Sequence, residues 1–208
     1  VHLLSFSPEK FLTVTASGEV ESKPIKGTRK RGATRDEDEV LRRELLASDK
    51  ERAENLMIVD LVRNDLARVC EIGSVRVTGL LEVESYAHVH QLVSTVRGTL
   101  LEGNVAVDAV LACFPAGSMT GAPKLSAVNL LDALERRPRG VYSGAWGYFG
   151  FDGSVDLAMT IRTVVIDANG VSIGTGGGIT ALSVPAEELE ETRIKVAALV
   201  QALGLVTL

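Results

Sequence analysis

Two pairs of glutamates have the residue type and spacing from which a metal site could be built. Glu51 and Glu54 lie three positions apart in one helix-forming stretch, and Glu188 and Glu191 lie three apart in another. Residues three apart project from one helix face, so two such faces brought together would form an oxygen-rich site suited to Mg²⁺. Spacing alone favours ordinary solvated helix faces. The apolar run at 56–59 indicates, however, that the helix of Glu54 is buried, and a buried carboxylate needs a partner or a metal.

Three further charged residues are candidates for reaction or substrate binding. Lys26 stands in PIKGT before Gly27, which permits close approach, but a lysine with an ordinary pKa of about 10.4 is a poor nucleophile unless it is desolvated. Its residue type alone therefore favours a solvated surface lysine. Glu9 follows Ser-Pro at a turn, which favours an exposed acid. Arg162 lies among apolar residues and needs either a substrate carboxylate or a buried salt bridge.

Two glycine-containing stretches are candidate anion sites. The run GTGGG at 174–178 follows a strand, and successive glycines let backbone N–H groups converge on a carboxylate or phosphate. A dinucleotide site is disfavoured because the run follows a hairpin instead of lying within a βαβ unit. The stretch GSMTGAPK at 117–124 is not a P-loop, because Ala-Pro separates Gly121 from the lysine. It is either an anion or hydroxyl site at a helix start or an ordinary loop with an N-cap.

The elements that must position these residues follow from local patterns. A hairpin is predicted at 11–16 and 20–23, a loop at 28–35, strands at 75–83 and 89–97, and helices at 105–114, 123–135 and 185–203. Residues 36–69 predict one long helix or two, with a capping box at Ser48 and Glu51 as a possible break. The dipeptides Asp152-Gly153 and Asn169-Gly170 predict an antiparallel meander over 142–175. The fold class is therefore α+β.

Composition excludes several classes of protein. The chain has 208 residues, 46% of them hydrophobic, and a net charge of -5, which is typical of a globular protein with a sizeable core. Interspersed charges disfavour a nucleic-acid partner, and no apolar run reaches the roughly 20 residues that span a membrane. Cys70 and Cys113 lie in apolar segments, which predicts buried thiols in a cytoplasmic protein. Because the chain opens on Val1 in a strand-like run, we expect a piece of a longer chain.

An ordered series of motifs extends over almost the whole chain. In chain order they are SFSPEKFL, PIKGTRKRG, DKERAENLMIVDLVRNDL, HQLVSTVRG, FPAGSMTGAPK, YSGAWGYFGFDG, LAMTIRTVVI, GTGGGI and EELEETRIKVAAL. The series resembles the C-terminal catalytic region of the chorismate-utilising enzymes, which include anthranilate, aminodeoxychorismate, isochorismate and salicylate synthases. The resemblance implies an antiparallel β-sandwich flanked by helices, of which residues 1–208 form a chorismate-binding catalytic region in the C-terminal half.

The resemblance also implies site residues. Glu54 and Glu191 match the positions that hold Mg²⁺ in the family, with Glu51 and Glu188 beside them, and Glu9 matches the acid that helps to expel the C4 hydroxyl. The implied substrate-binding residues are Thr28, Ser118, Gly121, Tyr142, Arg162, Gly176, Gly178 and Lys195.

Lys26 is the position that distinguishes members of the family. Anthranilate, isochorismate and salicylate synthases usually carry alanine there, whereas aminodeoxychorismate synthases that read PIKGT use the lysine as a nucleophile towards C2 of chorismate. The resemblance therefore implies amination of chorismate to 4-amino-4-deoxychorismate for folate synthesis, with ammonia from a glutamine amidotransferase subunit or domain. Gln91 stands where many members have a histidine, and His90 cannot replace that histidine because adjacent strand residues face opposite ways.

Two alternatives remain open at the level of sequence. One is anthranilate synthase component I, in which Lys26 would have no covalent role. The other is a non-catalytic fragment or interaction module, which would have an incomplete pocket and would expose apolar surface.

Overall fold

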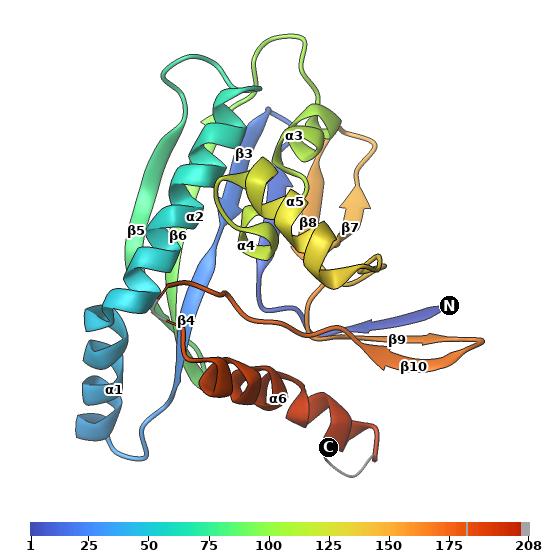
Figure 1. The fold of residues 1–208 in the computed structure, drawn as a ribbon. Coiled ribbons are helices and arrows are strands. Elements are labelled where there is room, and N and C mark those ends of the chain that lie inside the picture. Colours follow the sequence, from blue (N-terminus) through green and yellow to red (C-terminus); the bar gives the residue numbers. More distant parts are fainter. Residues whose placement is uncertain (182, 205–208) are drawn as a thin grey trace.

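The computed structural model describes residues 1–181 and 183–204, which form two antiparallel sheets with helices packed on the larger one (Figure 1). The larger sheet contains β2 (Lys10–Val14), β3 (Glu19–Lys23), β4 (Ile25–Lys30), β5 (Arg76–Ser85), β6 (Val89–Thr99), β7 (Ala145–Phe149) and β8 (Val155–Met159). The smaller sheet contains β1 (His2–Ser5), β9 (Thr163–Asp167) and β10 (Gly170–Ile173). The helices are α1 (Arg35–Ala47), α2 (Asp49–Ala67), α3 (Ala106–Cys113), α4 (Gly117–Thr120), α5 (Lys124–Glu135) and α6 (Pro185–Ala202). The predicted α+β class is confirmed.

β6 is the strand that connects the halves of the larger sheet. It pairs with β5, with β4 over 89–93 and with β3 over 96–99, so β3 and β4 lie end to end along one of its edges. Pro24 separates β3 from β4, which is expected because proline has no N–H to donate to a ladder. The order continues from β3 through β2 and β8 to β7, and the predicted hairpin of β2 and β3 is confirmed.

The long helical stretch is divided at Ser48. Thr34 caps α1 by accepting a hydrogen bond from the Glu37 N–H at 3.2 Å, and acidic residues occupy the first turn. Ser48 ends α1 and begins α2 in an extended conformation, but its side chain makes no capping hydrogen bond. The predicted break is therefore confirmed, whereas the predicted capping box is wrong.

Three local predictions are wrong because the observed structure depends on distant pairing or packing. The predicted loop at 28–35 is partly strand β4, which pairs with β6. The segment before α5 contains the short helix α4, which was expected to be a loop. The expected meander over 142–175 is instead two hairpins in different sheets, because β8 pairs with β2 while β9 pairs with β1. The chain turns between the sheets at Arg162, whose φ is 47°.

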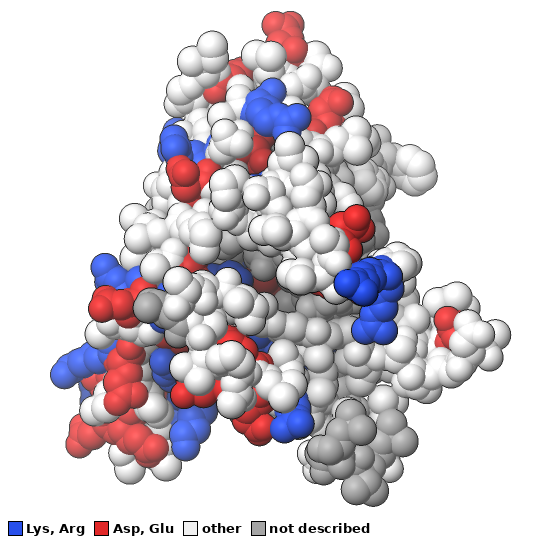
Figure 2. Space-filling view, in the orientation of Figure 1, with Lys and Arg blue, Asp and Glu red and all other residues white. Residues whose placement is uncertain are grey.

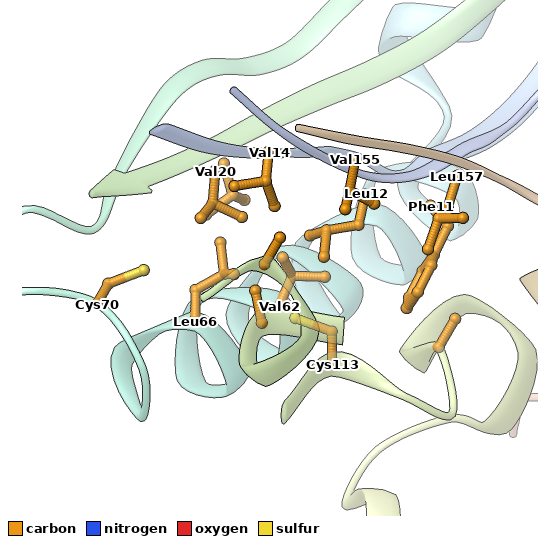
Figure 3. Packing of buried hydrophobic residues seen from close by; sticks show 14 of the residues in the cluster. Phe11, Leu12, Val14, Val20, Val62, Leu66, Cys70, Cys113, Val155 and Leu157 are labelled. Atoms are coloured by element: carbon orange, nitrogen blue, oxygen red, sulfur yellow. The ribbon is translucent and has the colours of Figure 1, made fainter. Parts of the chain in front are cut away.

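The main core lies between the larger sheet and helices α2 and α3. Side chains from β2, β3 and β8 meet Val62 and Leu66 of α2 and Cys113 of α3 (Figure 3). Burial of such aliphatic side chains contributes roughly 1.5–3 kcal/mol each relative to exposure, which fixes α2 against the sheet. Cys70 and Cys113 are buried thiols, as predicted, and burial raises their pKa to about 11 and about 12.

Several apolar side chains remain exposed on the opposite side of the core helices. No residue of α5 is buried, and Leu125, Leu130 and Leu134 are 76%, 61% and 77% exposed. Figure 2 shows few charged side chains over α5, in contrast to the dense charges around α1. No helix in the described part of the chain is both long enough and apolar enough to cross a membrane.

Candidate active site

A β-bulge directs Lys26 towards the helices. Ile25 pairs with Val93 and Thr28 with Gln91, so Lys26 and Gly27 both lie opposite Leu92. Gly27 has a φ of 92°, and a Cβ there would lie 2.9 Å from the Leu45 side chain and 3.1 Å from Glu51 Cβ. Glycine is therefore required both by the backbone conformation and by the approach of α1 and α2.

Lys26 contacts the short helix α4 and acts electrostatically on a buried acid. Its ammonium donates to the Ser118 carbonyl at 3.4 Å. Glu9 is only 9% exposed, so the exposed turn acid suggested by its neighbours is wrong. Burial raises the pKa of Glu9, while the Ser118 hydrogen bond and the charge of Lys26 act in the opposite direction. Glu9, Lys26 and Ser118 thus form one cluster in which a carboxyl group can hold a proton at higher pH than usual.

Three of the four candidate metal-binding glutamates are occupied by basic side chains. Glu51 accepts two hydrogen bonds from Arg29 at 2.7 and 3.2 Å, and Glu188, which is 6% exposed, accepts one from Lys50 at 2.8 Å. Hydrogen bonds from Lys50 and then from Ser183 lower the pKa of Glu188. Glu191 pairs with Lys195 at 2.6 Å.

Glu54 is the exception among these carboxylates. It makes no hydrogen bond or ion pair with any residue that the structure describes, although it is partly buried in α2. Burial raises its pKa, Lys26 and Lys50 oppose that shift, and the charges of Glu191 and Glu188 reinforce it. Two helices that are distant in sequence therefore bring carboxylates into the same electrostatic environment.

The residues fit a divalent cation in chemistry but are not arranged around one. Glu54, Glu188 and Glu191 offer the hard oxygen ligands that Mg²⁺ prefers, and the unpaired, partly buried Glu54 is the kind of group that a cation stabilises. Within the described residues, no three His, Cys, Asp or Glu side chains are grouped closely enough to hold a metal ion. Lys50 and Lys195 would have to release Glu188 and Glu191 before a metal could bind.

The glycine run at 174–178 connects these groups through close packing. A Cβ at Gly174 would lie 2.3 Å from the Tyr142 ring, one at Gly176 would lie 2.7 Å from the Tyr142 hydroxyl, and one at Gly178 would lie 3.2 Å from Glu54 Oε2. None of these three glycines has a φ in the left-handed region. The run therefore serves close approach of backbone to side chains, and Lys195 fixes it by donating to the Gly176 carbonyl at 3.1 Å.

Tyr142 packs against this run, and Gly121 ends α4. Arg139 stands over the Tyr142 ring at 5.8 Å and donates to the Met119 carbonyl at 2.8 Å. Burial raises the pKa of Tyr142, so its hydroxyl stays protonated and can donate a hydrogen bond. Gly121 ends α4 with a φ of 106°, which favours glycine.

Two of the predicted substrate-binding residues are exposed. Thr28 is exposed and shares a sheet face with Gln91, whereas Lys26 faces the helices. Arg162 is exposed, so the argument that burial forces it to find a partner is wrong. His90 is 1% exposed and bonds to Ser85 at 2.7 Å and Asp38 at 2.9 Å, which confirms that it cannot replace a histidine at Gln91.

Sequence reasoning missed two basic residues that shape the site. Lys50 and Arg29 neutralise Glu188 and Glu51. Lys50 lies four positions before Glu54, a spacing that places it on the same helix face and was available as a signal. Arg29 lies in the segment 28–35, which was predicted to be a loop. Its ion pair with Glu51 becomes apparent only once β4 is paired with β6.

Comparisons with known proteins identify similar sequences and a similar fold. The chain is 56% identical over 201 residues to aminodeoxychorismate synthase from Streptomyces griseus, covering 97% of this chain and 28% of that protein. It is 47% identical to anthranilate synthase component 1 from Aquifex aeolicus, covering 97% of this chain and 40% of that protein. The crystal structure of anthranilate synthase component I from Streptococcus pneumoniae TIGR4 matches with a TM-score of 0.83 and 40% identity, over 93% of this chain and 42% of that chain.

The chain thus spans well under half the length of each of these relatives. The sequence profile described as chorismate binding enzyme matches residues 1–201, which is nearly all of it. The protein belongs to the chorismate binding enzyme family.

Proposed function

We propose that this chain is the catalytic region of an enzyme that aminates chorismate to 4-amino-4-deoxychorismate, a precursor of p-aminobenzoate. The observation that carries the proposal is that the Lys26 ammonium bonds to Ser118 and acts electrostatically on both Glu9 and Glu54. A lysine in this position can act as a nucleophile next to an acid. The 56% identity to an aminodeoxychorismate synthase supports the same activity.

In the proposed reaction, the Lys26 ammonium first loses a proton to solvent, and the resulting amine attacks C2 of chorismate. The two ring double bonds shift, and the C4 hydroxyl leaves as water with a proton from Glu9, whose raised pKa suits a general acid. Ammonia then adds at C4, the two double bonds return, and the bond between C2 and Lys26 breaks, so that the lysine leaves as a free amine while the new C4 ammonium returns a proton to Glu9. The ammonia is expected to come from a glutamine amidotransferase partner or domain.

Mg²⁺ is the cofactor that the carboxylates would hold. Glu54, Glu188 and Glu191 are the proposed ligands, with Glu51 held beside them by Arg29. When bound, the cation would neutralise the substrate's ring carboxylate and so position chorismate. Lys195 and Tyr142 are then free to contact the remaining oxygens of the substrate from the edges of the glycine run.

Anthranilate synthesis is the second candidate, supported by 47% identity to an anthranilate synthase component 1. That product requires loss of the pyruvyl group and aromatisation. His90 is committed to Asp38 and Ser85, and Gln91 has no titratable side chain, so neither residue offers a base for that step. The present site therefore favours a product that keeps its pyruvyl ether.

Product analysis separates the candidates. The full-length protein is incubated with chorismate, MgCl₂ and ammonium chloride, and the products are resolved by mass spectrometry. We expect 4-amino-4-deoxychorismate, which yields p-aminobenzoate only after a lyase is added. Fluorescent anthranilate without an added lyase would overturn the proposal. The same assay on residues 1–208 tests the non-catalytic alternative, which predicts that this fragment neither binds nor converts chorismate.

A further inference from the structure

An ion pair with a buried carboxylate lies beside the cavity that Glu9 and Ser118 also line. Lys124, the first residue of α5, donates to Asp65 Oδ2 at 2.6 Å and to the Cys113 carbonyl at 2.9 Å. Asp65 lies on α2 and is only 4% exposed. The ammonium therefore joins both ends of segment 113–124 to one position on α2.

A second contact holds the middle of this segment against the same helix. A Cβ on Gly117 would lie 2.1 Å from Leu61 Cδ2, so the backbone of α4 rests directly on the Leu61 side chain. Leu61 and Asp65 are four positions apart and therefore occupy one face of α2. Gly117 against Leu61 and Lys124 against Asp65 form two attachment points, which we call the α2 clamp.

Ser118 lies between these attachment points. Its hydroxyl hydrogen-bonds to Glu9, and its carbonyl accepts the ammonium of Lys26 at 3.4 Å. Both proposed reactive side chains are therefore held by one residue of a four-residue helix. So short a helix cannot maintain its own position, because helix nucleation is unfavourable without tertiary contacts.

The ion pair is not expected to add much to the stability of the folded state. Taking Asp65 and Lys124 out of water costs about as much as their attraction returns, and well-packed apolar residues often replace such a pair without loss. A directional, charge-assisted bond fixes the distance between two elements more tightly than apolar contact does. This distinction makes the role of the pair testable.

We propose that Asp65 and Lys124 are positioning residues that hold Ser118 at the correct distance from Glu9 and Lys26. The proposal deepens the proposed function and rests on it for the identity of the reacting groups. Neither residue is among the proposed substrate-binding residues, and the two are bonded to each other, so loss of the pair should lower kcat and leave the KM for chorismate nearly unchanged. The mobility of α4 should rise at the same time.

The test replaces the pair by apolar residues in the full-length protein, as Asp65→Leu with Lys124→Met. We expect a Tm close to that of the wild type, a kcat at least tenfold lower and a KM within threefold. Hydrogen exchange of the Met119 and Gly121 amides, which are bonded to Ala116 and Gly117, should quicken at least tenfold while β6 amides stay protected. Wild-type kcat and exchange in this double variant would overturn the proposal.

Two further variants keep the test decisive if the double variant folds poorly. Lys124→Arg retains a cation beside Asp65, and we expect kcat and α4 exchange within threefold of wild type; a defect as large as that of the double variant would refute the role of charge. Arg63→Gln removes the exposed Arg63–Asp60 pair from the same helix and should change nothing. If the wild type forms no 4-amino-4-deoxychorismate, the proposed function fails, but the exchange measurement still decides for or against the α2 clamp.

Discussion

Lys50 on α2 donates a 2.8 Å hydrogen bond to Glu188 on α6, joining residues 138 positions apart in the chain. The carboxylate is almost fully buried, whereas the lysine side chain is 38% exposed. This pair closes the space between the two helices that carry the candidate metal ligands. Lys50 therefore occupies an oxygen of a proposed metal ligand, and a cation bound as proposed would compete with the lysine for it.

Replacement of Lys50 by methionine should strengthen Mg²⁺ binding. An ion pair with an exposed partner contributes about 0.5–1 kcal/mol, so freeing Glu188 should lower the Kd for Mg²⁺ about two- to fivefold. Isothermal titration calorimetry with MgCl₂ in the absence of chorismate measures the change. Arg193→Gln, which removes an exposed pair with Glu190 on α6, is the control and should leave the Kd unchanged. Weaker binding in the Lys50 variant would contradict competition between the lysine and the metal.

Replacement of Lys26 by alanine should lower turnover by about a thousandfold or more, because the covalent route is lost. Chorismate binding in the presence of Mg²⁺ should persist, since Lys26 is not among the proposed metal ligands. Intact-protein mass spectrometry without ammonia should detect a chorismate-derived adduct on the wild type and none on the variant. Lys30→Ala, at the exposed end of β4, should behave as the wild type does. Near-normal amination by the Lys26 variant would refute a covalent role.

Local sequence patterns predict the secondary structure correctly wherever neighbouring residues determine it. The helix start predicted at residue 36 lies one residue from the observed start of α1 at Arg35, and the predicted hairpin of β2 and β3 is observed. The glutamate pairs were predictable as same-face residues because helix geometry is a local property. These elements carry part of the candidate site.

The remaining features depend on contacts that no local pattern encodes. β4 contains three basic residues and a glycine without regular alternation, and it becomes a strand because β6 offers a partner. The bulge that directs Lys26 arises from the register of that pairing. Lys50 meets Glu188 only because α6 packs back towards α2, and Arg162 is exposed because β9 joins β1 in the smaller sheet.

The buried Glu9 should make stability depend on pH. Its pKa is raised above the unfolded value, so the folded state binds this proton more tightly, and the resulting stabilisation is complete below about pH 4.5 and is lost as pH rises through the folded pKa. Glu9→Gln, which stays neutral, should therefore be more stable than the wild type at pH 8, with the difference vanishing near pH 4. Urea denaturation at both pH values provides the measurement. A variant less stable than the wild type at pH 8 would contradict a desolvated carboxyl group.

The same variant should lose activity, because the proton that Glu9 donates is no longer available. General acid catalysis typically contributes 10²–10⁴-fold, so the kcat of Glu9→Gln should fall by at least a hundredfold. The wild-type kcat should decrease as pH rises through the raised pKa of Glu9, and this limb of the profile should be absent in the variant. A variant that keeps the alkaline limb would assign that titration to another group.

Because the glycine run packs closely on Tyr142, we expect neighbouring glycines to differ in how well they tolerate replacement by alanine. In Gly174→Ala, the new Cβ would lie 2.3–2.6 Å from Tyr142 ring and Cβ atoms, which cannot retreat without moving the ring. Overpacking of this kind costs roughly 1–3 kcal/mol, so the Tm should fall by several degrees and the KM for chorismate should rise. In Gly177→Ala, the new Cβ meets the tip of Glu188 at 3.3 Å, and a carboxylate tip can shift.

Differential scanning fluorimetry should therefore give a much lower Tm for Gly174→Ala than for Gly177→Ala. Steady-state kinetics should give a higher KM for chorismate in Gly174→Ala than in Gly177→Ala. Tyr142→Ala in the Gly174→Ala background removes the clashing ring atoms but keeps the Tyr142 Cβ, which would lie 2.4 Å from the new Cβ. It should therefore restore only part of the lost Tm, and it should not restore the KM, because the hydroxyl proposed to contact the substrate is gone. Equal effects at the two glycines would mean that the run serves backbone N–H binding of an anion, since that role depends on peptide orientation and not on the space beside each Cα.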